Sequence, residues 1–394
     1  MRVTLLWESK NFWRFTSCVA AMKYRRFGQT EQQLSIFSLG TMRFASAEAA
    51  CEVVSAAVEQ GINHIETAPA YGSSEQYIGE ALSTLHLSRE QFVLTTKLAP
   101  KLTANEVASA IDRSLAQLGV EYIDCLAVHG INAPDHLVWF QTHMLTELEG
   151  AIASGKIRHV GFSTHGPLDL ILSAIETGAF SFMNVHYNYF FQRNEEAIAQ
   201  AHQQDMGIFI ISPADKAGLL YTPPERLSEL CDPYDPLLLN YRWLLSDPRI
   251  TTLSIGPAVS DELEWPLRVA NADGALDAKE KAAIARLERT QKETLGTDMC
   301  EQCYACLPCP ESIHIPEVLR LRGAAIAYDM SEYGQYRYGM FENAGHWFPG
   351  RKGNRCSDCG ECLPRCPQQL NIPELLRDTH QRLKGSNRKR LWEE

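Results

Sequence analysis

The sequence predicts an α/β chain in which a (β/α)8, or TIM, barrel is followed by a small, mainly helical domain built around cysteines. Apolar runs rich in β-branched residues alternate with amphipathic helical stretches from residue 34 to about 271, which is typical of βαβ units and a parallel sheet. Eight of the 12 cysteines fall between residues 300 and 366. The 394 residues, with 45% hydrophobic content, allow one domain of about 250 residues and a smaller one.

Eight of the apolar runs are expected to be barrel strands. They cover residues 36–40, 62–66, 92–96, 123–128, 157–162, 183–186, 206–211 and 251–255. Eight such strands in succession predict a closed barrel. Active sites of these barrels lie at the carboxyl ends of the strands, so the polar residues that end each run are the candidates for function.

One helix between these strands is predicted in detail. Thr103 and Glu106 form a capping box, and Gly119 ends the helix. Its buried face is expected to consist of Val107, Ile111, Leu115 and Leu118. Such a helix has one apolar stripe and covers the outside of a barrel.

Two cysteine runs predict iron-sulfur clusters. The first reads C-EQ-C-YA-C-LP-CP and the second C-SD-C-GE-C-LPR-CP. Three cysteines at two-residue intervals wrap one cluster, while a fourth cysteine before proline usually ligates the neighbouring cluster in two-cluster ferredoxins. We therefore expect a ferredoxin-like domain with two 4Fe-4S clusters. The candidate ligands are Cys300, Cys303, Cys306, Cys309, Cys356, Cys359, Cys362 and Cys366.

The ligand set leaves alternatives open. Only two residues separate Cys309 from Cys306, which departs from the ferredoxin spacing and leaves open whether Cys309 is a ligand. Paired C-x2-C units can also hold zinc, and cysteines can form disulfides. Zinc rarely takes three evenly spaced cysteines with a fourth before proline, and disulfides need an oxidising compartment.

The remaining prolines help to place the helix and domain boundaries. Asp235 followed by Pro236 begins another helix, whereas Pro266 falls where the last barrel helix should run and leaves that boundary open. We expect an extension over 1–22 that is disordered, or untranslated if Met22 is the true start, the barrel over 23–275, a linker helix over 276–297, the 4Fe-4S domain over 298–380 and a basic tail over 381–394.

Charge and hydropathy exclude some classes of protein. A net charge of -11 argues against nucleic acid as a partner. Glu8, Lys10 and Arg14 interrupt the apolar stretch near the start, which makes it a poor signal peptide or membrane span. No internal run is long enough to cross a bilayer. We therefore expect a soluble, cytoplasmic protein with no membrane partner.

The strand ends carry residues suited to carbonyl chemistry. The second strand ends I-E-T-A-P-A-Y-G-S-S-E, the third T-T-K, the fourth D-C-L-A-V-H-G and the fifth G-F-S-T-H. With the cysteine runs, these segments resemble the aldo/keto reductase superfamily, specifically its members with a ferredoxin-like C-terminal domain. The resemblance covers residues 23 to about 376. It implies a nicotinamide-dependent oxidoreductase whose substrate is a small-molecule carbonyl or alcohol.

The resemblance places the catalytic tetrad of the family on Glu66, Tyr71, Lys97 and His129. Hydride reduction of a carbonyl leaves an alkoxide that needs a proton. Tyr71 would give this proton, and the Lys97 cation would lower the pKa of Tyr71. Glu66 would pair with Lys97, and His129 would orient the carbonyl oxygen. The family usually has aspartate where Glu66 stands, so we expect the lysine or the backbone to shift.

The resemblance also implies NADPH or NADH, although no G-x-G-x-x-G follows a strand. The expected contacts are Ser163 and Asn184 to the carboxamide, Ser212 and Gly218 to the pyrophosphate, and Gly256 and Glu262 to the adenosine. The adenosine segment, 254–264, has no basic residue. A 2′-phosphate normally binds arginine or lysine, whereas a free ribose hydroxyl pairs with a carboxylate. NADH and the loss of nucleotide binding therefore stay open beside NADPH.

Two further functions stay open because the chain combines different electron chemistries. Nicotinamide moves two electrons as hydride, whereas a cluster moves one at a time, and no flavin motif is evident. In one alternative the barrel binds nucleotide or a partner, and the clusters sense electrons or relay them to an electron-transfer protein. In the other the clusters only clamp the C-terminal segment.

Overall fold

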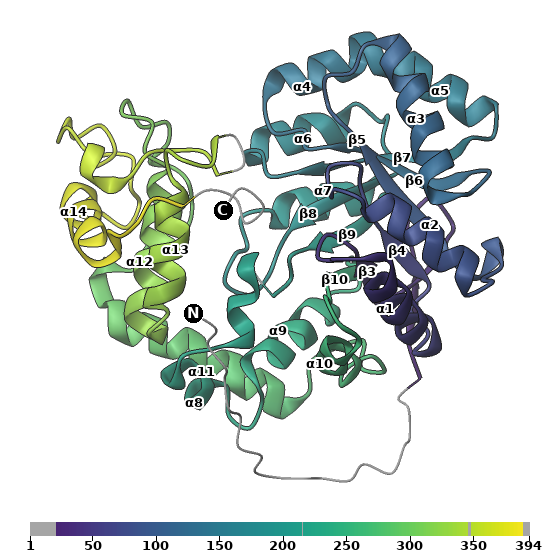
Figure 1. Ribbon diagram of the computed structural model, residues 1–394. Coiled ribbons are helices and arrows are strands. Elements are labelled where there is room, and N and C mark those ends of the chain that lie inside the picture. The colour runs from purple at the N-terminus through teal and green to yellow at the C-terminus, as the bar shows by residue number, and fades with distance from the viewer. Residues whose placement is uncertain (1–20, 215, 346–347, 389–394) are drawn as a thin grey trace, which may run out of the picture.

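Eight parallel strands close into a barrel in the computed structural model, which describes residues 21–214, 216–345 and 348–388 (Figure 1). The strands are β3 (Phe37–Gly40), β4 (His64–Glu66), β5 (Val93–Leu98), β6 (Ile123–His129), β7 (Ile157–Thr164), β8 (Phe182–His186), β9 (Gly207–Ile211) and β10 (Thr252–Ile255). Every predicted strand is confirmed, with ends that differ by at most two residues. Because neighbours follow chain order and β10 pairs with β3, the polar strand ends meet at one mouth of the barrel.

A hairpin that the sequence analysis did not predict closes the opposite mouth. Its strands, β1 (Tyr24–Arg26) and β2 (Gln33–Ser35), pair antiparallel. Phe27 follows β1, is fully buried, and has its ring centroid 5.3 Å from that of Phe182. A Cβ on Gly207 would stand 2.3 Å from the Phe27 ring, so only glycine fits there. The amino-terminal end of the barrel is therefore filled, and the carboxyl-terminal end is the one available for a site.

Helices cover the outside of the barrel. They are α1 (Ala47–Glu59), α2 (Ser74–Thr84), α3 (Ala104–Leu118), α4 (Pro134–Trp139), the π-helical turn η2 (Phe140–Met144), α5 (Leu145–Ala153), α6 (Leu168–Glu176), α7 (Glu195–Gln203), α8 (Glu225–Cys231), α9 (Pro236–Leu245) and α10 (Glu264–Leu267). The predicted capping box of α3 is present, because the Glu106 carboxylate accepts hydrogen bonds from both the backbone N–H and the hydroxyl of Thr103. Asp235 caps α9 as predicted. Pro266 lies within α10, which is a single short turn.

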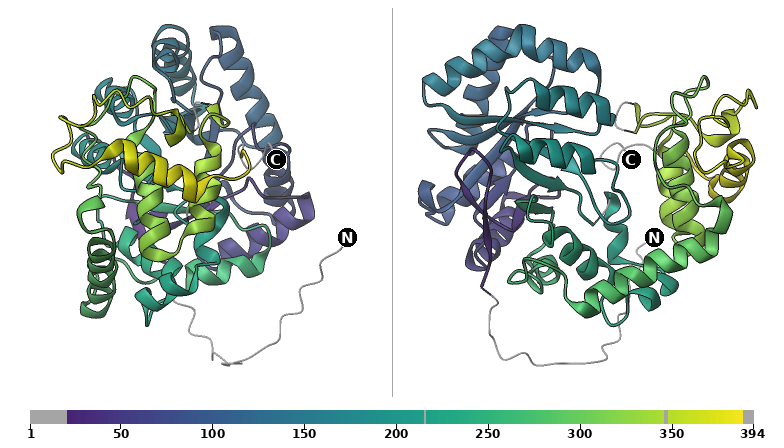
Figure 2. Two further views of the ribbon diagram at one scale, coloured as in Figure 1. Left: turned by 90° about the vertical axis from the view of Figure 1, so that its left-hand side faces the viewer. Right: turned by 180° about the vertical axis from the view of Figure 1, so that it is seen from behind.

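A second layer follows the barrel. The charged helix α11 (Ala278–Leu295) leaves the barrel and packs against α8 and α12. Figure 2 shows α12 (Ile315–Tyr328), α13 (Ser331–Met340) and α14 (Ile372–Leu383) standing together beside the barrel. The two cysteine runs lie in the loops that precede α12 and α14. This part of the chain is thus a helical frame that holds two cysteine-rich loops.

Residues 1–20 and 389–394, which contain most of the expected extension and the end of the expected basic tail, lie outside the described residues. Among the helices that the structure describes, none combines the length and the apolar character needed to cross a membrane.

Replacing the aromatic plug should destabilise the barrel. We expect Phe27→Ala to lower the free energy of unfolding by about 3–5 kcal/mol, since it removes a fully buried ring. Urea denaturation followed by far-UV circular dichroism measures the change. Val138→Ala, at a valine that is 58% exposed, is the control and should leave the midpoint unchanged. An unchanged midpoint for the Phe27 variant would contradict the plug.

Candidate active site and cluster-binding loops

The four candidate catalytic side chains come together at the carboxyl-terminal mouth of the barrel. Glu66 ends β4, Lys97 lies near the end of β5, His129 ends β6, and Tyr71 lies in the loop after β4. Lys97 Nζ donates a hydrogen bond of 2.9 Å to the Tyr71 hydroxyl oxygen and forms an ion pair with Glu66. The Tyr71 and His129 rings meet edge to face, with their centroids 5.8 Å apart. Four loops or strand ends therefore bring the four side chains into one connected group.

Lys97 is a buried cation held by oxygen atoms. Its side chain is 2% exposed, and Nζ also donates to the Thr67 carbonyl oxygen at 3.0 Å. Burial lowers the pKa of Lys97, whereas the adjacent Glu66 carboxylate favours the charged ammonium. Burial also raises the pKa of the Tyr71 phenol. Tyr71 therefore keeps its proton at neutral pH and is available as a proton donor.

Glu66 reaches Lys97 without separating Lys97 from Tyr71. The Tyr71 hydroxyl lies 3.4 Å from Glu66 Oε1. Glu66 Oε2 lies 3.6 Å from the place where a Cβ would stand on Gly40, the last residue of β3. The Glu66 carboxylate therefore contacts both Lys97 and Tyr71, while Lys97 keeps its hydrogen bond to Tyr71.

Ser163 and Asn184 lie side by side in β7 and β8, one strand further around the mouth from His129. Ser163 Oγ accepts a hydrogen bond of 3.0 Å from the Gly130 N–H. Asn184 is fully buried, yet neither its side-chain oxygen nor its side-chain nitrogen has a hydrogen-bond partner among the described residues. Buried amides are nearly always hydrogen-bonded. A carboxamide group, with one donor and one acceptor side, fits this amide.

The other predicted cofactor residues are distributed around the same mouth. Ser212 follows β9 and has a positive φ of 50°. Gly218 lies in the 3-10 helix η3 (Lys216–Tyr221), Gly256 follows β10, and Glu262 lies in η4 (Ser260–Leu263). The segments expected to contact the pyrophosphate and the adenosine thus follow neighbouring strands, as one extended nucleotide requires.

Arg43 is a charged residue of this region that the sequence analysis missed. Its guanidinium donates to the Gly256 carbonyl oxygen at 2.9 Å and forms two hydrogen bonds with the Glu262 carboxylate, at 2.6 and 3.1 Å. Arg43 stands three residues after the end of β3. Attention to every loop at a strand end, and not only to segment 254–264, would have identified it. The adenosine segment therefore does have a basic partner, although that partner is already paired.

Cysteines of the two runs lie close to one another in space. Cys309, from the first run, lines one cavity together with Cys356, Cys359 and Cys362 of the second run. Burial raises the pKa of the Cys300 thiol, with smaller contributions in the same direction from Cys303 and Cys366, so Cys366 lies near the first run. Among the described residues, no three His, Cys, Asp or Glu side chains are close enough to share a single metal ion. Cys309 thus joins three cysteines of the second run, and Cys366 lies near Cys300 of the first.

Comparison with known proteins assigns the chain. A family model described as "Aldo/keto reductase family" matches residues 37–289, well over half of the sequence. The chain belongs to the aldo/keto reductase family. A second model, described as a 4Fe-4S dicluster domain, matches residues 299–371. The protein is therefore an aldo/keto reductase-type oxidoreductase with an attached iron-sulfur domain.

Individual relatives of this aldo/keto reductase are distant. An uncharacterized oxidoreductase of Bacillus subtilis, YqkF, is 21% identical over 66% of this chain and 95% of its own length. The 6-dehydroglucose reductase of Novosphingobium aromaticivorans is 33% identical, but over only 36% of this chain and 51% of the relative. The holo form of an aldo-keto reductase from Bacillus halodurans has a TM-score of 0.59 at 22% identity, covering 67% of this chain and 96% of that one. This likeness supports the barrel fold.

The iron-sulfur domain of this aldo/keto reductase lies against the carboxyl-terminal mouth of the barrel. Arg320 of α12 donates to the Phe190 carbonyl oxygen, in the loop after β8, at 2.7 Å. The Phe190 ring also meets Tyr328 of α12 edge to face at 5.7 Å. Burial alone would raise the pKa of Glu317, but Arg320 outweighs it and holds that pKa at about 2. An ion pair within α12 therefore presents Arg320 to a loop that borders the active-site mouth.

Loss of a cysteine that connects the two runs should remove iron. We expect Cys309→Ala to lower iron and acid-labile sulfide from about eight to about four per chain, because one cluster loses a ligand while the other keeps all four. Analysis of anaerobically purified protein gives both counts. Cys51→Ala, at a half-buried cysteine of α1, should retain the full content. Full iron in the Cys309 variant would show that Cys309 is not a ligand.

Proposed function

We propose that this aldo/keto reductase reduces a small-molecule carbonyl, or oxidises the corresponding alcohol in reverse, with NADPH or NADH. The observation that supports this proposal is the contact of Lys97 with both Tyr71 and Glu66 beside His129. Taken singly, a buried lysine or a loop tyrosine is unremarkable in function. At the mouth of a barrel, the hydrogen bond between them makes Tyr71 a proton donor with the Lys97 ammonium beside its hydroxyl.

In this proposal a nicotinamide cofactor, when bound, would supply the hydride for the carbonyl carbon. The carbonyl oxygen then becomes basic and takes the Tyr71 hydroxyl proton. The Lys97 ammonium, which donates to the Tyr71 oxygen, stabilises the phenolate that remains. Glu66 keeps Lys97 charged, and His129 orients the carbonyl oxygen. Ser163 and Asn184 would hold the carboxamide.

We propose two 4Fe-4S clusters, one bound by Cys300, Cys303, Cys306 and Cys366 and the other by Cys309, Cys356, Cys359 and Cys362. The shared cavity of the second group supports this assignment. A cluster supplies one-electron chemistry when bound. Because iron-sulfur ligands must stay reduced and unpaired, we also propose that the protein works in a reducing compartment such as the cytoplasm.

Removing the Tyr71 hydroxyl should abolish reduction. We expect Tyr71→Phe to lower kcat by about 10²–10⁴-fold, the contribution typical of a positioned general acid, while the visible cluster absorbance stays the same. Oxidation of NADPH and NADH against a panel of aldehydes measures the rate. The matched control is Tyr24→Phe, at a tyrosine whose hydroxyl donates to Gly61 near the hairpin, and it should react at the original rate. Equal turnover in both variants would exclude Tyr71 as the acid.

Release of Arg43 should change the preference between nucleotides. In the native chain Glu262 neutralises Arg43, so we expect NADH to be used at least as well as NADPH. Glu262→Gln frees the guanidinium for a 2′-phosphate, and we expect the ratio of kcat/KM for NADPH over NADH to rise about tenfold. Lys101→Gln, at an exposed lysine paired with Asp135, serves as the control. If Glu262→Gln leaves this ratio unchanged, the Arg43–Glu262 ion pair does not determine the preference between NADPH and NADH.

A further inference from the structure

The second cysteine cavity reaches the protein surface at Cys359. Cys359 is exposed, whereas Cys362 from the same cavity is buried. Beside it, Leu363 leaves 41% of its surface exposed. A Cβ on Gly360, the residue after Cys359, would stand 3.9 Å from Leu363 Cδ1. An apolar side chain therefore adjoins the one exposed thiol of this group.

The segment that carries this thiol is basic although the whole chain is acidic, and Asp358 and Glu361 are the acidic residues next to Cys359. From residue 351 to 388 there are eight arginine and lysine residues and four aspartate and glutamate residues, against a net charge of -11 for the chain. The side chains of Arg355, Arg377 and Arg382 are 46%, 54% and 49% exposed, and they pair with Glu342, Asp358 and Asp378 respectively. Lys384 is also exposed and donates only to Gln381 among the contacts described. Positive charge is thus concentrated on the segment that carries the second cysteine run.

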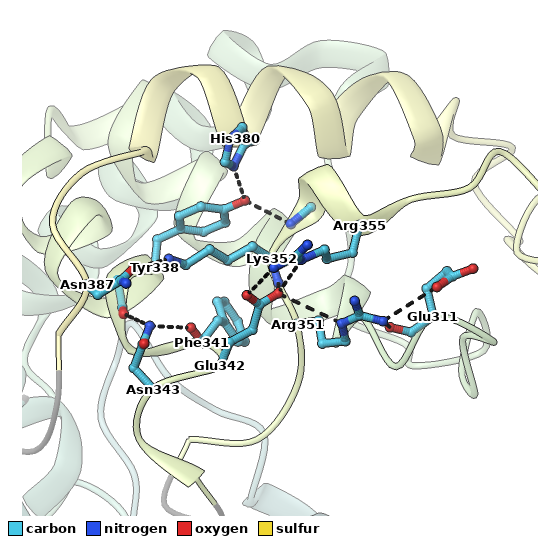
Figure 3. A network of polar contacts seen from close by, with 12 residues as sticks. Glu311, Tyr338, Phe341, Glu342, Asn343, Arg351, Lys352, Arg355, His380 and Asn387 are labelled. Carbon is cyan, nitrogen blue, oxygen red and sulfur yellow. Dashed lines mark hydrogen bonds and ion pairs between the residues drawn. The ribbon is translucent and has the colours of Figure 1, made fainter.

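A polar network fixes the loop that leads into this run (Figure 3). The Glu342 carboxylate accepts hydrogen bonds from the Lys352 backbone N–H at 3.2 Å and from the Arg355 side chain at 2.9 and 3.0 Å. Arg351 lies 3.9 Å from the same carboxylate. The Tyr338 hydroxyl accepts from the Gly353 N–H at 2.8 Å and contacts His380 Nδ1 at 3.0 Å. Glu342 thus holds Arg355 and the Lys352 backbone, and Arg351 lies nearer to Glu311, at 3.5 Å. The Lys352 ammonium donates to Asn387 and has no carboxylate partner among the contacts described.

We propose that the exposed surface around Cys359, with Leu363 and the basic residues of 351–388, binds an acidic one-electron carrier protein. This proposal rests on the second cluster of the proposed function. An oxidised cluster held by Cys309, Cys356, Cys359 and Cys362 would accept one electron from the reduced centre of the carrier. The carrier is oxidised by one electron, the cluster is reduced by one, and no bond or proton is transferred. Opposite charges steer such encounters and raise their association rates at low salt.

Binding of an acidic plant-type [2Fe–2S] ferredoxin, with an acidic flavodoxin as the second probe, tests the surface. We expect micromolar binding to the intact holoprotein at low ionic strength that weakens on the order of tenfold as salt screens the charges. Arg377→Glu and Lys384→Glu should each weaken binding on the order of tenfold at low salt. Lys156→Glu makes the same charge change before β7, at the hairpin end of the barrel, and should leave binding unchanged.

Three further readouts keep this test independent of the reductase. Iron content should stay the same in all three variants, and reduction of the cluster band by the reduced carrier should slow only in Arg377→Glu and Lys384→Glu. NAD(P)H-dependent carbonyl reduction should not change. Failure of both probes to bind, or equal weakening in Lys156→Glu, would overturn the docking surface while leaving the proposed reductase intact.

Discussion

The buried ammonium of Lys97 is the constraint on which the active-site mouth depends. Removing a cation from water costs several kcal/mol unless other groups replace the water. The replacements are the Glu66 carboxylate, the Thr67 carbonyl and the Tyr71 hydroxyl, and all three come from the end of β4 and the loop that follows. The same interactions that make the charge tolerable therefore aim it at Tyr71. Loss of Glu66 would leave the Lys97 ammonium buried without a counter-charge, and loss of Lys97 would leave the Glu66 carboxylate in the same state.

The fold was predictable where its cause is local. Strand periodicity predicts β3 to β10, and the Thr103–Glu106 capping box predicts where α3 begins, because both signals lie within one element. Contacts between distant segments leave no such signal. Phe27 plugs a barrel end defined by β8 and β9, and Arg43 pairs with Glu262 across 219 positions. The hairpin and the basic partner of the adenosine segment could therefore not be read from the sequence pattern.

The candidate site was likewise predictable where the signal is local and not where distant segments meet. Glu66, Lys97 and His129 each lie near the end of a strand, so strand order in a closed barrel is enough to bring them together. Cys309 is different, because its spacing from Cys306 left its partners open. The helices α12 and α13 lie between the two runs and bring Cys309 to the cavity of Cys356, Cys359 and Cys362. The folding of the chain, and not the spacing within the motif, determines which group of cysteines Cys309 joins.

The contact between α12 and the barrel affects how a loss of carbonyl reduction on removal of iron is interpreted. Gln302, within the first cysteine run, donates to the Pro316 carbonyl oxygen at the start of α12, and Arg320 of α12 holds the Phe190 carbonyl of the β8 loop. A purely structural cluster would therefore influence the active-site mouth through this chain of contacts. Loss of carbonyl reduction on removal of iron would follow with or without electron flow. Helix α14, which carries Arg377, also packs on α12, where Arg322 pairs with Asp378 at 2.6 Å. The rate at which a reduced carrier reduces the cluster band therefore distinguishes a cluster that carries electrons from one that only holds the domain in place, whereas the rate of carbonyl reduction does not.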